Sequence, residues 1–381
     1  MGWSVNRQTG LTWHLRELSS KGYTLFTPHG DSRTYLLDIE GRVVHSWKFN
    51  HIHPGYGRLL ENGNLLMTGS DVNLPDPPPD EPTKAPPPFE RHITRLGGYH
   101  TTLCEVNWEG EVVWEYVNRA QHHDFHRLPN GNTMVPEWVE LPEDLHRKVK
   151  GGTKKPREKL PRLLGDDIVE IDREQNEIRR IHTWQLLDPV KDPIYFNIRR
   201  WEWTHLNGID VNDAGDIVFS ARNADRVAII SGETGELTWK FDKTHGQHNP
   251  TFTPGGNVMI FDNGNSASRV IEVDPKTDEI AFQYNGKPMH QFFSGHISGA
   301  SRLWTGNILV CEGTSGRLFE VARDGQVVWE FINPFLNNNK RGEPTVSIYR
   351  AHRYPADFPG LAGKDLDPAR WGNLNRLHKL A

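Results

Sequence analysis

Two kinds of β-hairpin alternate along this 381-residue chain, and their alternation limits the folds that it can adopt. The first kind joins two strands of alternating apolar residues through a turn with Asp or Glu and often Gly, and its second strand often ends in Trp-x-Phe or Trp-x-Tyr. It occurs, more weakly in the third copy, at residues 34–47, 102–116, 167–181, 226–241, 269–284 and 317–331. The second kind turns at Asn-Gly-Asn or a related sequence and follows His53, His123, His205, His248 and His296.

The hairpins combine into units of four strands, which is the size of one blade of a β-propeller. Each hairpin of the second kind pairs with the next one of the first kind, which makes five blades. The hairpin at 34–47 and the segment 351–353 are left over at the two ends, and together they complete a sixth blade that removes the open sheet edges. The sequence therefore predicts an all-β, six-bladed β-propeller of four-stranded blades, closed by N- and C-terminal segments that share one blade. A two-sheet sandwich would not show this regular alternation.

The chain reads as one domain with two insertions. We expect residues 1–21 to be an N-terminal extension and residues 22–381 to be a single propeller domain, because repeat-built all-β folds often run this long. Inserts at about 71–98 and 141–164 separate the second and third strands of their blades. These loops share a rim with the connections that carry the histidines, so we predict a lid over one end of the channel, with decorative loops as the alternative.

Composition excludes several classes of function. The net charge of −5 provides no basic field to attract nucleic acid or anionic lipid, and no apolar stretch reaches the length of a membrane span. Cys104 and Cys311 lie far apart in apolar strand-like runs, so we expect buried free thiols. The N-terminal residues lack a signal-peptide pattern, which favours a cytoplasmic protein or an exported one whose signal has been removed.

A histidine precedes almost every hairpin of the second kind. The six residues are His53, His123, His205, His248, His296 and His352. Because the first strand of a propeller blade is its innermost, we predict that these side chains converge on one axial pocket. A structural histidine copied by repeat duplication is the alternative. In the sequence QHHDFHR, the pocket-facing residue is one of His122, His123 and His126.

A histidine ring of this kind suits three chemistries, which the pattern alone does not separate. Imidazoles bind transition metals, act as general acids and bases near neutral pH, and attack as nucleophiles. If a divalent metal is bound, we expect its ligands among His123, His205, His248, His296 and His352.

Short motifs in a fixed order narrow the choice. They are His122–His123–Asp124, then Trp203-Thr204-His205-Leu206-Asn207, then a hairpin that ends in Ser220-Ala221-Arg222, then Gln247–His248–Asn249, then Phe261-Asp262-Asn263-Gly264. In order and spacing these motifs resemble the bacterial arylsulfate sulfotransferase family, whose members need no nucleotide sulfate donor. The resemblance spans roughly residues 22–352. It implies a six-bladed propeller, in agreement with the blade count, and transfer of a sulfuryl group from an aryl sulfate to a phenol through a sulfohistidine.

The resemblance also implies roles for individual residues. It assigns the nucleophile to His248, the His-x-Asn pair to His205 and Asn207, the Ser-x-Arg arginine to Arg222, and the remaining catalytic histidine to His123. An arginine can donate two hydrogen bonds to the sulfuryl oxygens, on which charge resides in a loose transition state. A neutral His248 would attack sulfur, and a second histidine would protonate the departing phenolate.

The remaining expectations concern substrate and partners. We expect substrate contacts from His53, His296, His352, Asn249 and Trp203. The expected partner is a small aromatic molecule, without nucleic acid, membrane or cofactor, and a homodimer is left open. The alternatives are a His-ligated metal-dependent enzyme or a lyase acting on a small aromatic or anionic substrate, and a non-catalytic binding propeller.

Overall fold

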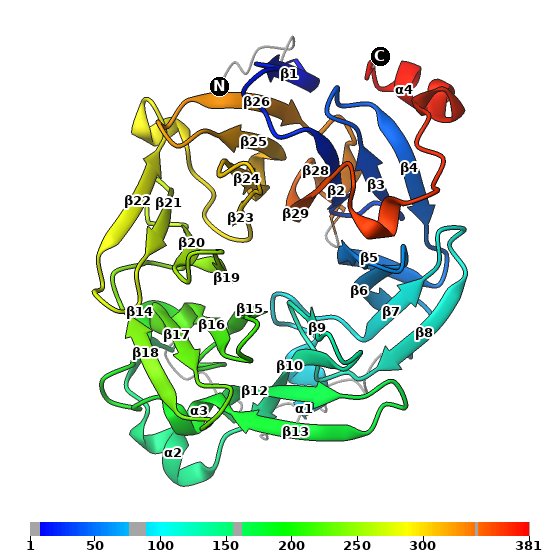
Figure 1. Cartoon of the computed structure of the whole chain (residues 1–381). Helices are drawn as coiled ribbons and strands as arrows, with labels where there is room; N and C mark the ends of the chain where they lie inside the picture. Colours follow the sequence, from blue (N-terminus) through cyan, green and yellow to red (C-terminus); the bar gives the residue numbers. More distant parts are fainter. Residues whose placement is uncertain (1–7, 76–88, 155–161, 340–341, 381) are drawn as a thin grey trace.

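In the computed structural model, six antiparallel sheets surround a central axis, which confirms the predicted six-bladed β-propeller (Figure 1). The structure describes residues 8–75, 89–154, 162–339 and 342–380. The closing blade contains β29 (Ile348–Pro355), β2 (Gly22–Pro28), β3 (Arg33–Leu37) and β4 (Val43–Lys48). Its innermost strand β29 comes from the C-terminal part of the chain and pairs with β2, so both ends of the chain share this blade as predicted.

The other five blades follow one another along the chain. The second blade contains β5 (Ile52–Leu59), β6 (Leu65–Asp71), β7 (Thr102–Val106) and β8 (Val112–Val117), and the third contains β9 (His126–Arg127), β10 (Thr133–Glu140), β12 (Leu164–Ile171) and β13 (Glu177–His182). The fourth contains β15 (Leu206–Val211), β16 (Ile217–Ala221), β17 (Arg226–Ile230) and β18 (Leu237–Phe241). The fifth contains β19 (His248–Phe252), β20 (Val258–Asp262), β21 (Arg269–Val273) and β22 (Ile280–Asn285), and the sixth contains β23 (Gly299–Arg302), β24 (Ile308–Glu312), β25 (Arg317–Val321) and β26 (Val327–Ile332).

The N-terminal extension takes part in the sixth blade. Its strand β1 (Gly10–His14) pairs with the outer strand β26 and widens that sheet to five strands. Near the C-terminus, α4 (Gly372–Leu377) packs beside β4, where the Asn375 side chain hydrogen-bonds both backbone groups of Val43. The two ends of the chain therefore lie close together across the junction of the sixth and the closing blades (Figure 1).

Smaller helices and strands lie in the connections outside the blades. The first insert holds α1 (Phe89–Ile93), and the second holds α2 (Glu143–Lys148) and β11 (Gly151–Thr153), which pairs with β14 (Ile194–Arg199). The others are α3 (Thr183–Leu186), the hairpin of β27 (Asn337–Asn338) and β28 (Pro344–Thr345), and the 3-10 helices η1 (Arg222–Ala224), η2 (Met289–Gln291), η3 (Gly313–Ser315), η4 (Pro359–Leu361) and η5 (Pro368–Trp371). Among the described residues, no helix has the length and apolar character needed to cross a bilayer.

Recurring tryptophans join neighbouring blades. The indole N–H groups of Trp47, Trp114, Trp239 and Trp329 donate to Asn107 O, Arg173 O, Asp278 Oδ1 and Ile39 O at 2.7–3.1 Å. Each donor lies on the outer strand of one blade, and each acceptor lies in the outer turn of the next blade. The repeated Trp-x-Phe/Tyr sequence therefore buries a large apolar surface between blades while its polar N–H stays hydrogen-bonded.

Candidate active site

The inner strands begin at one end of the axial channel. Several residues at or just before these strand starts have a strained backbone. Left-handed φ angles occur at His123 (58°), His205 (49°), Asn249 (50°), Ile297 (52°) and Ser298 (88°), none of which is glycine. Such conformations cost roughly 1–3 kcal/mol each and gather where they position functional groups. We call this end of the channel the strand-start end, and the opposite end, where the inner strands turn back, the turn end.

Histidines of three blades come together at the strand-start end. The ring centroids of His123 and His205 lie 4.5 Å apart, although the residues belong to neighbouring blades. Burial and the nearby charges of His205 and His122 hold the pKa of His123 well below its usual value. Burial, Arg222 and His205 do the same for the pKa of His248.

The six predicted histidines do not form a single ring. His352 pairs in register with Leu25, well inside the inner strand β29, and its Nε2 lies 2.8 Å from the Tyr56 hydroxyl. His126 lies at the corresponding depth, one residue from the turn that closes its hairpin, and bonds Asp210 at 3.1 Å. His352 and His126 therefore belong to the turn end. The prediction could not count residues from a hairpin turn for His352, because its strand β29 pairs with β2 from the other end of the chain.

A buried ion pair separates the two ends. Arg350 Nη1 donates to Asp124 Oδ2 at 2.7 Å, and both side chains are about 1% exposed. Arg350 Nη2 also donates to Asn207 O at 3.1 Å, and Asp124 accepts the Ile209 N–H at 3.0 Å. The pair ties the third, fourth and closing blades together across the axis. The catalytic candidates are therefore those on the strand-start side of this pair.

His205 is oriented by a carboxylate. Its Nδ1 lies 2.6 Å from Glu202 Oε1, and Glu202 Oε2 accepts the Trp138 indole N–H at 3.1 Å. The carboxylate fixes the orientation of the ring and occupies its Nδ1, which leaves Nε2 as the available nitrogen. Glu202 was not among the residues predicted from the sequence, although it directly precedes the motif that contains His205.

A second carboxylate stands behind His123. Asp166 Oδ1 lies 3.1 Å from His122 Nε2, and His122 Nδ1 lies 2.7 Å from His123 Nδ1. Burial would raise the pKa of Asp166, but the hydrogen bonds from His122, Thr204 and the Leu206 N–H lower it overall. With Asp166 ionised, the His122 Nε2–H donates to it and His122 Nδ1 accepts the proton of His123 Nδ1. This assignment leaves the lone pair of His123 on Nε2.

The protonation pattern of His248 follows from its neighbours. Asn263 donates through Nδ2 to Ser294 O at 2.6 Å and Ile297 O at 3.1 Å, so its oxygen must face His248 Nδ1, 2.7 Å away. His248 Nδ1 therefore carries the hydrogen and Nε2 carries the lone pair. In this state Nε2 accepts the Ile297 N–H at 3.1 Å.

A pocket of about 200 Å³ opens beside this group, and its lining combines a cation with aromatic rings. Arg222, at the start of η1, lines this pocket, as do Tyr195 and Phe293. Asp225 and His245 line the same pocket and bond each other at 2.9 Å. The guanidinium suits an anionic group and the two rings suit a planar apolar body. No sequence motif marked Tyr195 or Phe293, since they come from different connections.

Two predicted contact residues, Trp203 and Asn249, and one predicted catalytic residue, Asn207, are buried and support the surrounding structure. Trp203 is fully buried and its indole donates to Asp192 O at 2.7 Å, so it packs in the core and cannot stack on a substrate. Asn207 donates to Gln247 O at 2.9 Å and so holds the segment that carries His248. Asn249 is buried against Gly299, where it supports the start of the neighbouring blade. All three lie next to or near the candidate catalytic histidines in sequence and hold the backbone around them.

The other two predicted contact residues lie at the rim. His296 is exposed, and burial of part of its ring together with the Arg222 charge lowers its pKa. His53 is exposed at the start of β5, and within the described residues no hydrogen bond or ring contact joins it to the buried histidines. His100, to which the sequence assigned no role, acts on His123, since its charge contributes to the lowered pKa.

The first insert ends at this site. A side chain at Gly98 would collide with His123 Nε2, and one at Gly97 would lie 3.8 Å from His205. The insert therefore covers the histidine pair with glycine backbone. The second insert packs on the 186–203 connection through β11 and β14. The predicted lid extends over residues 76–88 and 155–161, which lie outside the described residues, and closure over the channel stays a prediction.

The histidines that were expected to bind a metal in the channel are dispersed in the structure. The residues named for it were His123, His205, His248, His296 and His352. In the described part of the chain, no three of these histidines bring their ligand nitrogens within 4.8 Å of one another. Within the described ranges, one group of ligand atoms is this close together, and it lies away from the channel, where the closing and second blades meet.

The fold and site define a six-bladed β-propeller with buried histidines and an arginine at one end of its axis. The family profile described as arylsulfotransferase (ASST) matches residues 89–334. This chain belongs to that family, as its motifs had indicated. Among curated proteins, none matches the chain.

One solved structure supports the fold. A protein of unknown function from Bacteroides caccae has 12% sequence identity and a TM-score of 0.54, over 88% of this chain and 99% of that one. A streptogramin B lyase has 11% identity and a TM-score of 0.48, over 91% and 93% of the two chains. A virginiamycin B lyase from Staphylococcus aureus has 14% identity and a TM-score of 0.43, over 81% and 85%. At these scores, the two lyases carry no argument about this chain.

Proposed function

We propose that the protein transfers a sulfuryl group from an aryl sulfate to a phenolic acceptor, with His248 as the transient carrier. The observation that carries this proposal is the pocket lined by Arg222, Tyr195 and Phe293 and by Gly246, which belongs to the segment that holds a neutral His248. The cation would bind the sulfate group, and the rings would contact the aryl group. A small aromatic molecule is the expected partner.

The first half-reaction uses the lone pair on His248 Nε2. It attacks sulfur, the S–N bond forms, and the S–O bond to the aryl group breaks. The leaving oxygen takes a proton from His205, whose imidazolium is stabilised by Glu202. Arg222 neutralises charge on the non-bridging oxygens, while Asn263 holds the proton on Nδ1 of the sulfohistidine.

The second half-reaction reverses these roles. The acceptor phenol gives its proton to neutral His205 and its oxygen attacks sulfur. The S–N bond breaks, and the electron pair returns to His248 Nε2. His123, backed by His122 and Asp166, lies against His205 and would stabilise its changes of charge. All of these steps use side chains of this chain.

The Ile297 amide must move before His248 can attack, because its N–H occupies the Nε2 lone pair. Ile297 holds a left-handed φ of 52°, which is unfavourable for a β-branched residue. We propose that substrate binding releases this N–H from Nε2 and that it then donates to a sulfuryl oxygen. The strained backbone would favour that change.

The test follows 4-nitrophenyl sulfate, whose released phenolate is coloured. Turnover should require a phenol acceptor, and without one the purified protein should release one equivalent of nitrophenol and carry a sulfuryl group. Peptide mass spectrometry after rapid quenching should place that group on His248. A group on His205 would overturn the choice of nucleophile, because Glu202 also leaves the Nε2 of that residue available. Steady hydrolysis without an acceptor would overturn transfer itself.

Each alternative function predicts a different result. A metal-dependent enzyme should lose turnover after chelation and regain it with the metal. A lyase should form an unsaturated product from a substrate without a sulfate group. A binding propeller should retain an aromatic ligand without converting it.

A further inference from the structure

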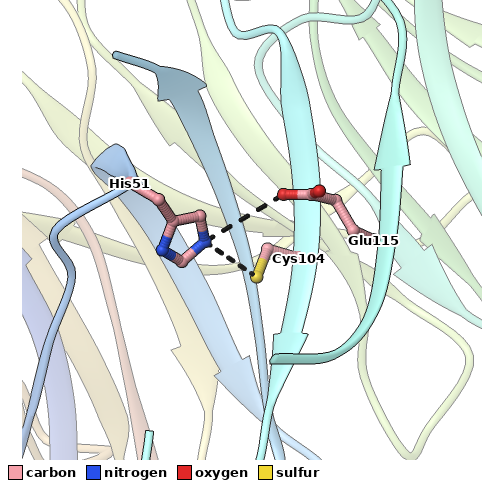
Figure 2. Close-up of side chains that lie close together, drawn as sticks. All are labelled: His51, Cys104 and Glu115. Carbon is pink, nitrogen blue, oxygen red and sulfur yellow. Dashed lines mark hydrogen bonds and ion pairs between the residues drawn. The ribbon is translucent and has the colours of Figure 1, made fainter. Parts of the chain in front are cut away.

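A separate group of ligand atoms lies away from the channel, at the contact of the closing and second blades. Figure 2 shows His51 on the segment that leads into β5, Cys104 on β7 and Glu115 on β8, with their side chains directed toward one another. Cys104 belongs to the apolar cluster that includes Trp47 and Trp108 and joins these two blades. None of the three residues belongs to the proposed transfer site.

The spacing of these atoms is close to that of a tetrahedral metal site. His51 Nε2 lies 3.7 Å from Cys104 Sγ and 4.0 Å from a carboxylate oxygen of Glu115, and the three ligand atoms all lie within 4.8 Å of one another. Around a tetrahedral zinc ion, with bonds of about 2.0–2.3 Å, neighbouring donor atoms are about 3.3–3.6 Å apart. Small side-chain rotations would close the remaining gap.

The backbone holds the three donors in place. Cys104 and Glu115 are directly paired across β7 and β8, so the sheet sets the distance between thiol and carboxylate. The His51 carbonyl accepts the Val72 N–H at 3.0 Å, which fixes the segment before β5 against the end of β6. His51 and Glu115 are 36% and 37% exposed, while Cys104 is buried. An ion would therefore enter from solvent and keep a water molecule as its fourth ligand.

We propose that His51, Cys104 and Glu115 form a zinc site that ties the connection between two blades to the outer hairpin of the second blade. A thiolate, an imidazole and a carboxylate together favour Zn²⁺ over Mg²⁺ or Ca²⁺, which prefer oxygen ligands. The bound ion would link residues that are distant in sequence, and it would stabilise the folded protein by binding it in preference to the unfolded chain.

The experiment uses the full-length protein after chelator treatment and gel filtration. Titration with Co²⁺ should show one equivalent bound per chain, with tetrahedral visible bands and a thiolate-to-cobalt charge-transfer band, and Zn²⁺ should displace it. Cys311→Ala should keep the charge-transfer band, because Cys311 is the other thiol of the chain. Cys104→Ala should remove the band.

Two further variants test the site without changing a core residue, because Cys104→Ala could lose the metal through misfolding. Glu115→Gln and His51→Asn change partly exposed side chains, and each should weaken Co²⁺ binding at least about 10-fold while the circular dichroism spectrum stays unchanged. Zn²⁺ should raise the thermal midpoint of the wild type and not that of Glu115→Gln. Cobalt bound without a thiolate band, a band that persists in Cys104→Ala, or unchanged affinity in Glu115→Gln would each overturn the site. These results do not depend on sulfuryl transfer.

Discussion

The two ends of the axial channel carry similar residue types and differ in how these are paired. At the turn end, His126 bonds Asp210, His352 bonds the Tyr56 hydroxyl, and Arg58 Nε also donates to that hydroxyl, at 2.5 Å. At the strand-start end, Nδ1 is the held nitrogen of each ring: Glu202 lies against that of His205, Asn263 against that of His248, and His122 against that of His123. In the proposed reaction, these histidines can act because Nδ1 is fixed and Nε2 can be used.

The largest expected effect on the transfer rate comes from a substitution at the strand-start end. His248→Asn removes the nucleophile, so the rate of transfer from 4-nitrophenyl sulfate to phenol should fall at least about 10³-fold. The KM for the aryl sulfate should change little, because Arg222 would still bind the sulfate group as proposed. A wild-type rate in this variant would exclude His248 as the carrier.

Breaking the ion pair between the two ends should cost the most stability. Asp124→Asn leaves the Arg350 guanidinium buried without its carboxylate, so the free energy of unfolding should fall by about 3–5 kcal/mol in urea titrations. Adding Arg350→Met should recover part of this loss, because the unpaired charge is then removed. A loss below about 1 kcal/mol would show that the pair does not hold the blades together.

Glu202→Gln tests how the strand-start end uses its carboxylates. The variant removes the anion that stabilises the His205 imidazolium, so kcat should fall about 10²–10⁴-fold and the pH profile of kcat should change shape. Glu140→Gln is a matched control, since Glu140 is exposed at the end of β10. An unchanged pH profile would show that Glu202 only packs against Trp138.

Stability should decrease as the pH falls, because both ends bury neutral histidines. Burial lowers the pKa of His123, His248 and His352 well below the usual value, and it lowers the pKa of His45 and His92 to about 4. The stabilisation is complete above the unfolded pKa of about 6.5 and is lost toward pH 4, where the unfolded chain binds more protons. Each histidine should contribute up to about 1.4 kcal/mol per pH unit, measured by urea unfolding at pH 7, 6 and 5. A flat profile would contradict the neutral assignment.

The smallest effect on activity is expected at the turn end. His352→Gln disturbs the hydrogen bond with Tyr56, so we expect a loss of about 1–2 kcal/mol in stability and a transfer rate within about 2-fold of wild type. The same variant should reduce the pH dependence of stability. A drop in activity comparable with that of His248→Asn would remove the distinction between the two ends.

Local patterns in the sequence determined the architecture. Turn residues and period-two apolar strands identified the hairpins, their count predicted six blades, and the two unpaired ends predicted the shared closing blade, because hairpin formation depends on residues close together in the chain. The motifs around His205 and His248 also identified the family. They selected catalytic candidates that the structure brings together, although their roles remain proposals.

Only the tertiary structure decided how deep each histidine lies in the channel and what it bonds. The strand pairing placed His352 and His126 at the turn end, and the partners Glu202, Asp166 and Asn263 were found only once the backbone had been folded. The same holds for the approach of His51 to Cys104 and Glu115. Strand patterns report which side of a sheet a residue faces, but register and contacts between blades depend on packing of segments far apart in the sequence.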